Sequence, residues 1–292
     1  MDITANMVKD LREKSGAGMM DAKKALVENG GDMEKAMDWL RTKGIAKAAK
    51  KADRVAAEGM VWAISNGSAG AMVEVNAETD FSSKNEKFTS FAKAVAELAL
   101  NAKTSDVDAI KALPMVGATV QEKLTDLVAT VGENMTIRRA MFMEAQGGTV
   151  GAYVHMNGKI GVLTQLAGKA DAGTVAKQVA MHVAATNPQS LDRTSLNPDV
   201  LAREKAIYVE QAKASGKPDN VVEKMVEGRM NKFAEEVCLV DQAFVMNPDQ
   251  KVKDVVAQAG VTLTGFARFG LGEGIEKKQE DFAAEVAKAA AV

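Results

Sequence analysis

The chain has 292 residues, a formal net charge of −2 at pH 7 and a single cysteine, Cys238. Its length suits about two domains with a substantial core. The near-zero charge argues against a general nucleic-acid binder, which normally carries a basic excess. One cysteine excludes an intrachain disulfide and makes a thiolate metal cluster implausible. The first residues lack the apolar core of a signal peptide, and no apolar run approaches membrane-spanning length, so we expect a soluble, cytoplasmic protein.

Residues 1–54 predict a small helical unit. Apolar residues recur at helical spacing in three short segments that glycine-containing turns separate. We expect Asp32 to cap the third helix, and we expect that helix to end near Gly44. Such a unit buries little apolar surface by itself and is typical of a docking module. We interpret the basic segment 46–54 as a linker with a solvated charged face, and a contact surface for an acidic partner is the less favoured alternative.

Two β-hairpins, each followed by a helix, are predicted in the central part of the chain. The first pairs 60–65 with 71–76, and the second pairs 150–155 with 159–167, each around an Asn-Gly turn signal. The repeated order of hairpin and helix predicts two related α+β subdomains.

Between the two hairpins we expect further helices and one strand. The helix after the first hairpin runs to about Leu100, and a short helix covers 107–113. Thr119 and Glu122 have the spacing of a capping box, which opens another helix that Gly132 closes. A strand is predicted at 136–144.

The last third of the chain predicts a helical hairpin followed by mixed elements. Helices at 199–214 and 218–233 carry only a thin apolar stripe, which is typical of a protruding arm. A sheet-like segment at 236–245, a helix at 251–259, a strand at 261–269 and a final amphipathic helix at 275–291 follow.

Phe81 lies in the joint between the first hairpin and its helix. Ser83 and Glu86 have capping-box spacing, which places the helix start near Ser83 and leaves 79–82 as an exposed joint. Neither possible register gives Phe81 a local apolar partner. We favour burial of Phe81 in the core under the loop; the alternative is a projecting anchor for a partner protein, beside the charge of Asp80.

The residues that could carry chemistry are few. His182 lies on an apolar helix and is interpreted as a core residue, whereas His155, at a strand end, is expected to be accessible and has no Asp or Cys nearby in sequence. The glycine-rich segment 270–274 only weakly resembles a phosphate loop. We therefore expect no cofactor, no metal site and no enzyme, and predict a binding protein with several contact surfaces.

Short segments spread along the chain match a known family: 11–26 (LREKSGAGMMDAKKAL), 47–51 (KAAKK), 74–81 (EVNAETDF), 132–139 (GENMTIRR), 159–163 (KIGVL), 181–185 (MHVAA), 215–218 (SGKP), 224–230 (KMVEGRM), 244–246 (FVM) and 272–276 (GEGIE). The resemblance is to elongation factor Ts and covers nearly the whole length of the chain. It implies an α+β fold with a three-helix, ubiquitin-associated-like N-terminal domain at 1–54 and a core N-subdomain at 55–148. It also implies a core C-subdomain at 149–187 and 237–271, a coiled-coil arm at 188–236 and a C-terminal helical module at 272–292.

The resemblance implies a guanine-nucleotide exchange factor for elongation factor Tu, and it reverses the preference for a buried Phe81. In the family a Thr-Asp-Phe-Val motif inserts into the partner and disturbs its magnesium site, so that bound GDP loosens. Thr79, Asp80 and Phe81 match this motif, and Ser82 stands where the family has valine. Other matched contact positions are Lys23, Lys51, Val131, Gly132, His155, Val245 and Met246, and the final helix is expected to dock on the partner.

The implied partner is elongation factor Tu, GDP-bound or nucleotide-free, with a homodimer or a 2:2 complex as further expectations. No direct contact with nucleotide, nucleic acid or membrane is expected. The alternative function is a ribosome- or RNA-associated helical adaptor, which would use 47–54 and Arg138-Arg139. An enzyme is a distant third.

Overall fold

The computed structural model describes residues 3–15, 17–168 and 171–276. All but the first two residues of the predicted C-terminal helix at 275–291 lie outside the described residues.

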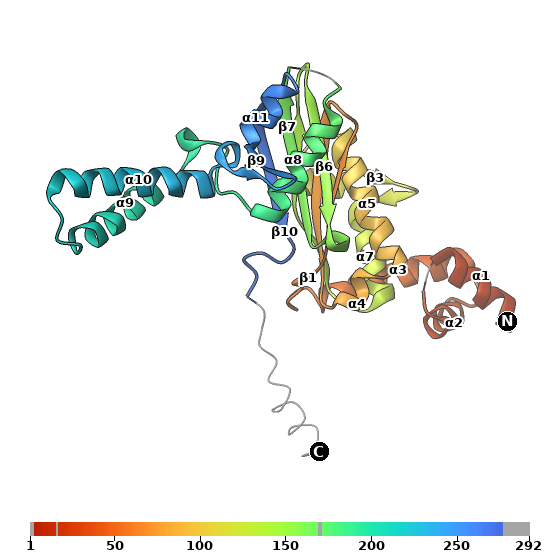
Figure 1. Ribbon diagram of the computed structural model, residues 1–292. Helices are drawn as coiled ribbons and strands as arrows, with labels where there is room; N and C mark the ends of the chain where they lie inside the picture. The colour runs from red at the N-terminus through yellow and green to blue at the C-terminus, as the bar shows by residue number, and fades with distance from the viewer. Residues whose placement is uncertain (1–2, 16, 169–170, 277–292) are drawn as a thin grey trace, which may run out of the picture.

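Two three-stranded antiparallel sheets form the centre of the molecule (Figure 1). The first has the order β1-β2-β5, with β1 at Glu58–Ser65, β2 at Ala69–Ala77 and β5 at Met135–Glu144. The second has the order β10-β7-β6, with β10 at Thr262–Gly270, β7 at Ile160–Ala167 and β6 at Thr149–His155. The expected α+β class and both predicted hairpins are confirmed.

The sheets pack face to face, and helices cover the outer face of each. α5 (Glu86–Asn101) packs on the first sheet and α8 (Gly173–Thr186) on the second. Val61, Met72 and Leu163 belong to the apolar cluster between the sheets. The close approach requires Gly161, because a Cβ at this position would lie 2.4 Å from Val61 Cγ1.

β2 is buried along its whole length because both of its faces are covered. Its alternating residues divide between two environments: Val73 and Val75 belong to the α5-facing cluster, whereas Met72 belongs to the cluster between the sheets. Glu74 alternates with Val73 and Val75, so it shares the face of Met72, where a carboxylate requires polar partners.

The N-terminal unit consists of α1 (Ala5–Ser15), α2 (Met19–Glu28) and α3 (Met33–Ala49), around a small core that includes Leu11 and Leu26. The predicted cap of the third helix is confirmed, since the Asp32 side chain accepts a 3.1 Å hydrogen bond from the Lys35 N–H. The predicted end near Gly44 is wrong, because α3 continues to Ala49. Contacts with α7 (Val120–Val131) support the extension: a Cβ on Gly44 would meet Ala129 at 3.4 Å, so the glycine allows close packing there.

The region between the two hairpins contains α6 (Val107–Ala112) and α7, as expected. The Thr119–Glu122 capping box is confirmed, and Gly132 ends α7 with φ +89°. A short hairpin of β3 (Pro114–Met115) and β4 (Ala118–Thr119) precedes α7 and was not predicted.

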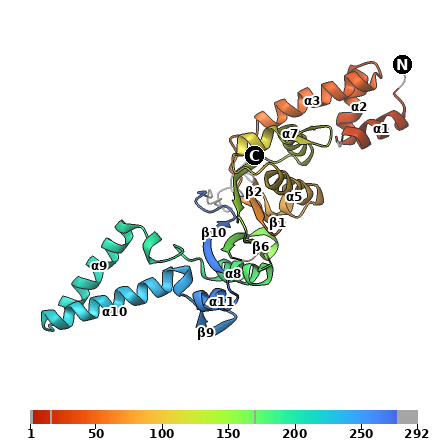
Figure 2. The same cartoon turned by 90° about the horizontal axis from the view of Figure 1, so that it is seen from above.

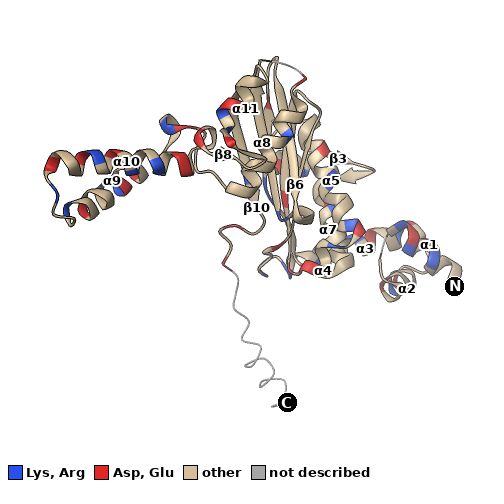
Figure 3. Ribbon diagram, in the orientation of Figure 1, with Lys and Arg blue, Asp and Glu red and all other residues tan. Residues whose placement is uncertain are grey.

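α9 (Pro198–Lys213) and α10 (Asp219–Val237) form the expected arm, which projects from the core at the end opposite the N-terminal helices (Figure 2). Its apolar seam is thin and includes Ala212, Val222 and Val226. Basic and acidic residues are interspersed along its helices (Figure 3).

After the arm the predicted sheet-like segment at 236–245 is largely wrong. α10 continues to Val237 and a 3₁₀ turn, η3, covers Leu239–Asp241. Only β8 (Ala243–Phe244) is strand, paired with β9 (Asn247–Lys251) ahead of α11 (Val252–Gln258). Two further 3₁₀ turns, η1 at Met156–Gly158 and η2 at Arg193–Ser195, complete the described elements.

Candidate partner-binding surface

The segment after β2 forms a separate helical turn, α4 (Asp80–Ser83), rather than the start of the long helix. Thr79 is its N-cap and accepts a hydrogen bond from the Ser82 N–H at 3.4 Å. The predicted helix start near Ser83 is therefore wrong. The Asn85 side chain accepts from the Lys87 N–H at 2.9 Å and opens α5 instead.

This turn directs adjacent side chains in opposite directions. Phe81 is 79% exposed, whereas Ser82 is 5% exposed. α4 packs against β1 and β2, which accounts for the burial of Ser82. The interpretation favoured from spacing, a buried Phe81, is wrong. The alternative is confirmed in its geometry, since the aromatic side chain projects into solvent.

Charged groups surround the exposed ring. Lys84 Nζ lies 5.4 Å from the Phe81 ring centroid and donates a 2.7 Å hydrogen bond to Asp80 Oδ2. This hydrogen bond lowers the pKa of Asp80, against a smaller opposing effect of burial. The surface therefore presents an aromatic ring beside a carboxylate that stays ionised at neutral pH.

Thr79 is also tied to the loop after α7. Its N–H and Oγ1 donate to the Glu133 carboxylate at 3.0 and 2.7 Å. Next to it, the Asn134 N–H donates to Glu78 Oε1 at 2.5 Å. These contacts hold the N-terminal end of the turn that presents Phe81.

Two more of the predicted contact residues meet in this loop. The Lys51 ammonium donates to the carbonyl oxygen of Gly132, and Asn134 Nδ2 donates to the carbonyl oxygen of Arg54 at 2.7 Å. Val131, which precedes Gly132, is half-buried against the first core cluster. The segment after α3 is thus bonded to the loop that supports the Phe81 turn.

His155 lies at the end of β6, directly before η1. It is half-buried, and its Nδ1 lies 2.9 Å from the Tyr153 hydroxyl. η1 packs on β1 so closely that a Cβ on Gly158 would lie 2.7 Å from Met60 Cβ. Because α4 and η1 both contact β1, His155 and the Phe81 turn flank the same strand.

The remaining predicted contact residues lie elsewhere. Lys23 is exposed on α2, in the N-terminal unit. Val245 and Met246 are 44% and 46% exposed in the turn between β8 and β9.

The strand that leads into the Phe81 turn, β2, carries a buried carboxylate that sequence reasoning missed. Glu74 is fully buried, and its Oε2 accepts from Arg139 Nε at 2.6 Å. Arg138 Nη1 donates to the same carboxylate at 3.1 and 3.3 Å, and the Gly272 N–H donates to Glu74 Oε1 at 2.9 Å. Burial by itself raises the pKa of Glu74, but the hydrogen bonds from Gly272, Arg139 and Asn76 outweigh it, so its pKa lies below the ordinary value.

A β-bulge explains why two consecutive arginines reach one carboxylate. Glu74 pairs with Arg139 and Val75 with Ile137, which leaves Arg138 as the extra residue of β5. Both guanidinium groups are therefore engaged with Glu74, which weakens the RNA-adaptor alternative that relied on them. The charged Glu74 in a largely apolar strand was the available signal.

The segment 270–274, which weakly resembles a phosphate loop, is held by the same cluster. The Gly272 N–H bonds to Glu74, and Arg139 Nη2 donates to the Gly270 carbonyl oxygen at 3.0 Å. Gly272 has φ +69°, and a Cβ there would lie 2.4 Å from the Ala57 carbonyl oxygen. The glycine at this position is therefore explained by packing.

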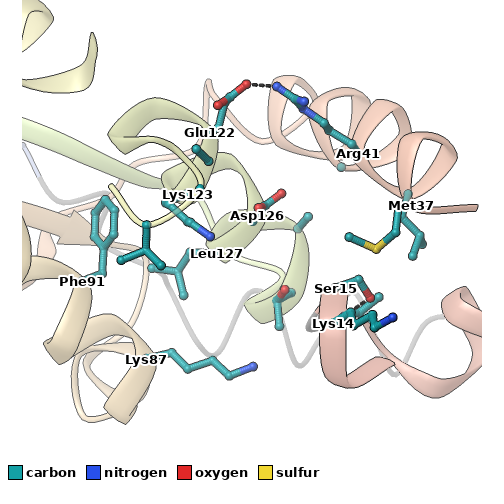
Figure 4. A pocket seen from close by; sticks show the side chains of 18 of the residues that line it. Lys14, Ser15, Met37, Arg41, Lys87, Phe91, Glu122, Lys123, Asp126 and Leu127 are labelled. Carbon is teal, nitrogen blue, oxygen red and sulfur yellow. Dashed lines mark hydrogen bonds and ion pairs between the residues drawn. The ribbon is translucent and has the colours of Figure 1, made fainter. Parts of the chain in front are cut away.

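A separate groove of about 720 Å³ lies between the N-terminal helices and α7 (Figure 4). An ion pair between Arg41 and Glu122 spans α3 and α7. Burial raises the pKa of Asp126 in this groove, with Lys123 and Arg41 opposing the shift. None of the predicted contact residues, all of which are described, lines it.

Among the described residues, no group of three or more His, Cys, Asp and Glu side chains has the geometry to hold a metal ion. None of the described helices has the length and apolar character needed to cross a membrane.

An exposed aromatic side chain on a turn that is hydrogen-bonded to a neighbouring loop is typical of a protein-binding surface rather than of a ligand pocket. The sequence pattern of the family described as Elongation factor TS matches residues 78–273. Proteins named Elongation factor Ts from Magnetococcus marinus, Paracoccus denitrificans and Gluconobacter oxydans are 55%, 56% and 53% identical to it. Each match covers 99% of this chain, and 99%, 98% and 98% of the respective relatives. This chain belongs to the elongation factor Ts family.

Proposed function

We propose that this protein is the guanine-nucleotide exchange factor for elongation factor Tu in translation elongation. It binds the GDP-bound partner, disturbs the Mg²⁺ and nucleotide site, and promotes GDP release. Family membership supports the partner, and the 79% exposure of Phe81 is the observation that carries the mechanism. A large exposed aromatic side chain is a typical anchor for a partner protein.

The turn 79–82 is the element that we propose to act on the partner. Hydrogen bonds from Thr79 to Glu133 and from Lys84 to Asp80 order it before binding. Pre-ordering reduces the conformational entropy lost on association. Phe81 enters the partner, while the ionised Asp80 brings a negative charge and a hard oxygen ligand near the Mg²⁺ site.

Exchange then follows from linked equilibria and needs no chemistry in this chain. A protein that binds the nucleotide-free partner more tightly than the GDP-bound partner lowers the partner's affinity for GDP by the same ratio. Each 1.4 kcal/mol of coupling changes that affinity about tenfold. GTP displaces the factor through the same coupling.

The other contact residues enlarge the proposed interface. Lys51, Gly132, Ser82, Val131 and His155 belong to or support the surface around Phe81. Lys23 on α2 and the Val245–Met246 turn add two further contact sites.

We propose the same division of the chain as expected above: docking at 1–54, a two-part core at 55–148 and at 149–187 with 237–271, an arm at 188–236 and a C-terminal module at 272–292.

Release of a fluorescent GDP analogue from elongation factor Tu tests the proposal. We expect catalytic acceleration at substoichiometric amounts of this protein. Phe81→Ala is expected to slow exchange about tenfold or more, with an unchanged melting temperature because the ring is already exposed. Val116→Ala is the matched control, since Val116 is 90% exposed on the β3–β4 turn. Normal exchange by Phe81→Ala would contradict the assigned role.

We further propose that the chain forms a homodimer or a 2:2 complex with elongation factor Tu. Partly exposed apolar residues on the arm, Ile207 and Val221, support a role for α9 and α10. Light scattering of the complex gives its mass directly. A 1:1 complex at micromolar concentration would overturn this assembly but not the exchange activity.

A further inference from the structure

His182 is a fully buried imidazole on α8, which packs on the outer face of the second sheet. A buried imidazole needs partners for both ring nitrogens. Both partners lie about 60 residues further along the chain: Gln242 precedes β8, and Val245 is in the β8–β9 turn.

The hydrogen-bond network determines the tautomer of His182. Gln242 Nε2 donates to the Glu236 carbonyl oxygen at 2.7 Å, because a carbonyl can only accept. Gln242 Oε1 therefore faces His182 Nε2, at 2.8 Å, and Nε2 must carry the proton. Nδ1 is left as an acceptor, and it receives the Val245 N–H at 3.2 Å.

The same ring also fixes the residue before Val245. His182 stacks on Phe244 with ring centroids 5.7 Å apart and an interplanar angle of 28°. Phe244 is buried and pairs with Asn247, so Val245 and Met246 are the two residues of the turn. One histidine thus holds the buried residue before the turn and the first N–H within it.

We propose that His182 is a positioning residue for the partner-binding turn: its neutral imidazole, by accepting from the Val245 N–H and stacking on Phe244, sets the direction in which Val245 and Met246 meet elongation factor Tu. The inference rests on the proposed function, in which these two residues contact the partner. The contact between His182 and Val245 joins two segments that are far apart in the sequence, 181–185 and 244–246.

A pair of amide variants separates positioning from stability. The carboxamide of His182→Asn reaches the Nδ1 position and keeps an acceptor for the Val245 N–H. The longer His182→Gln places its carboxamide near the Nε2 position, so it keeps the Gln242 contact and loses the Val245 contact. Both variants lose the stacking on Phe244, so we expect similar losses of thermal stability.

Partner affinity and amide exchange are compared between the two variants, because their similar stability leaves the Val245 contact as the difference between them. We expect His182→Gln to bind elongation factor Tu about three- to tenfold more weakly than His182→Asn, the effect of one hydrogen bond. The Val245 amide is expected to stay protected from hydrogen exchange in the Asn variant and to lose protection in the Gln variant. Equal affinities and equal protection in the two variants would overturn the inference.

Two further measurements keep the result unambiguous. In the unaltered protein, ¹⁵N chemical shifts of His182 report the tautomer, and a proton on Nδ1 would overturn the inference even if neither variant folds. Truncation of Val245 and Met246 to alanine tests the contact itself. If truncation leaves affinity unchanged, the proposed contact fails; if truncation weakens affinity while His182→Gln does not, only the positioning role fails.

Discussion

Arg139 donates a 2.6 Å hydrogen bond to Glu74, its cross-strand partner, in the middle of the buried β2 strand. The bulge at this point places Arg138 on the same carboxylate. The Gly272 N–H, from the far end of the chain, also donates to this carboxylate. The cluster thereby ties the 270–274 turn to the strand that leads to Phe81. A charge so placed is tolerated only while its partners remain.

Glu74→Gln is expected to lower the free energy of unfolding by about 3 kcal/mol, because it removes the charge that two arginines share in a buried site. Urea denaturation measures the loss, and the Gly272 amide should exchange faster with solvent. Glu144→Gln is the control, since Glu144 bonds to Lys103 at 2.6 Å on the surface and should change stability by less than about 1 kcal/mol. Equal effects of the two substitutions would contradict a special role for Glu74.

Thr79→Val is expected to cost about 1 kcal/mol of stability and to slow nucleotide exchange. Valine keeps the shape of threonine but cannot cap α4 or donate from its side chain to Glu133. Thr79→Ser retains the hydroxyl and should behave as the unaltered protein in both thermal unfolding and exchange. If the valine variant promotes nucleotide exchange at the normal rate, order in the turn does not limit the activity.

Ser82→Val restores the residue typical of the family and is expected to leave exchange unchanged. Ser82 is buried against β1 and β2, so a larger apolar side chain would contact the core rather than the partner. We expect a gain in stability of about 1 kcal/mol from the added buried methyl groups. A changed affinity for elongation factor Tu with unchanged stability would show instead that this position meets the partner.

Acid is expected to destabilise the protein through His182. Burial lowers its pKa below the ordinary 6.5, although the hydrogen bond to Gln242 acts in the opposite direction. Phe244, Gln242 and Thr186 are the side chains that face it, and none carries a charge. Below pH 6.5 the imidazole is protonated in the unfolded chain while it is still neutral in the folded chain. The free energy of unfolding therefore falls as the pH falls.

Urea denaturation between pH 5.5 and 7.5 checks this sign. The difference in unfolding free energy between the unaltered protein and His182→Asn should shrink toward acid pH, because the variant lacks the titrating group. Parallel curves across this range would rule out a contribution from His182.

Local sequence patterns were sufficient for most of the secondary structure. The two hairpins, the Thr119–Glu122 capping box and the closing Gly132 were predicted and found. Each depends on hydrogen bonds or backbone angles within a few residues, and such features are visible in a short window of sequence.

The failures occurred where distant segments compete with local signals. The local sequence predicts a helix end near Gly44, but α3 continues through it because the glycine packs on Ala129. The local sequence predicts that Ser83 caps the helix, but α4 packs on β1 and Asn85 is the cap of α5. The alternative function assigned Arg138-Arg139 to an RNA contact, but a bulge places both residues on Glu74.

The sequence by itself determined the family, the order of the elements and the residues of the motif around Phe81. Only the tertiary structure decided which side chains of that motif face solvent, because Phe81 and Ser82 are neighbours whose exposure depends on the packing of α4 against the sheet. It also decided that His182 holds Val245, 63 residues away. Local hydrogen bonds are encoded by neighbouring residues, whereas burial and long-range hydrogen bonds exist only after the chain has brought its layers together.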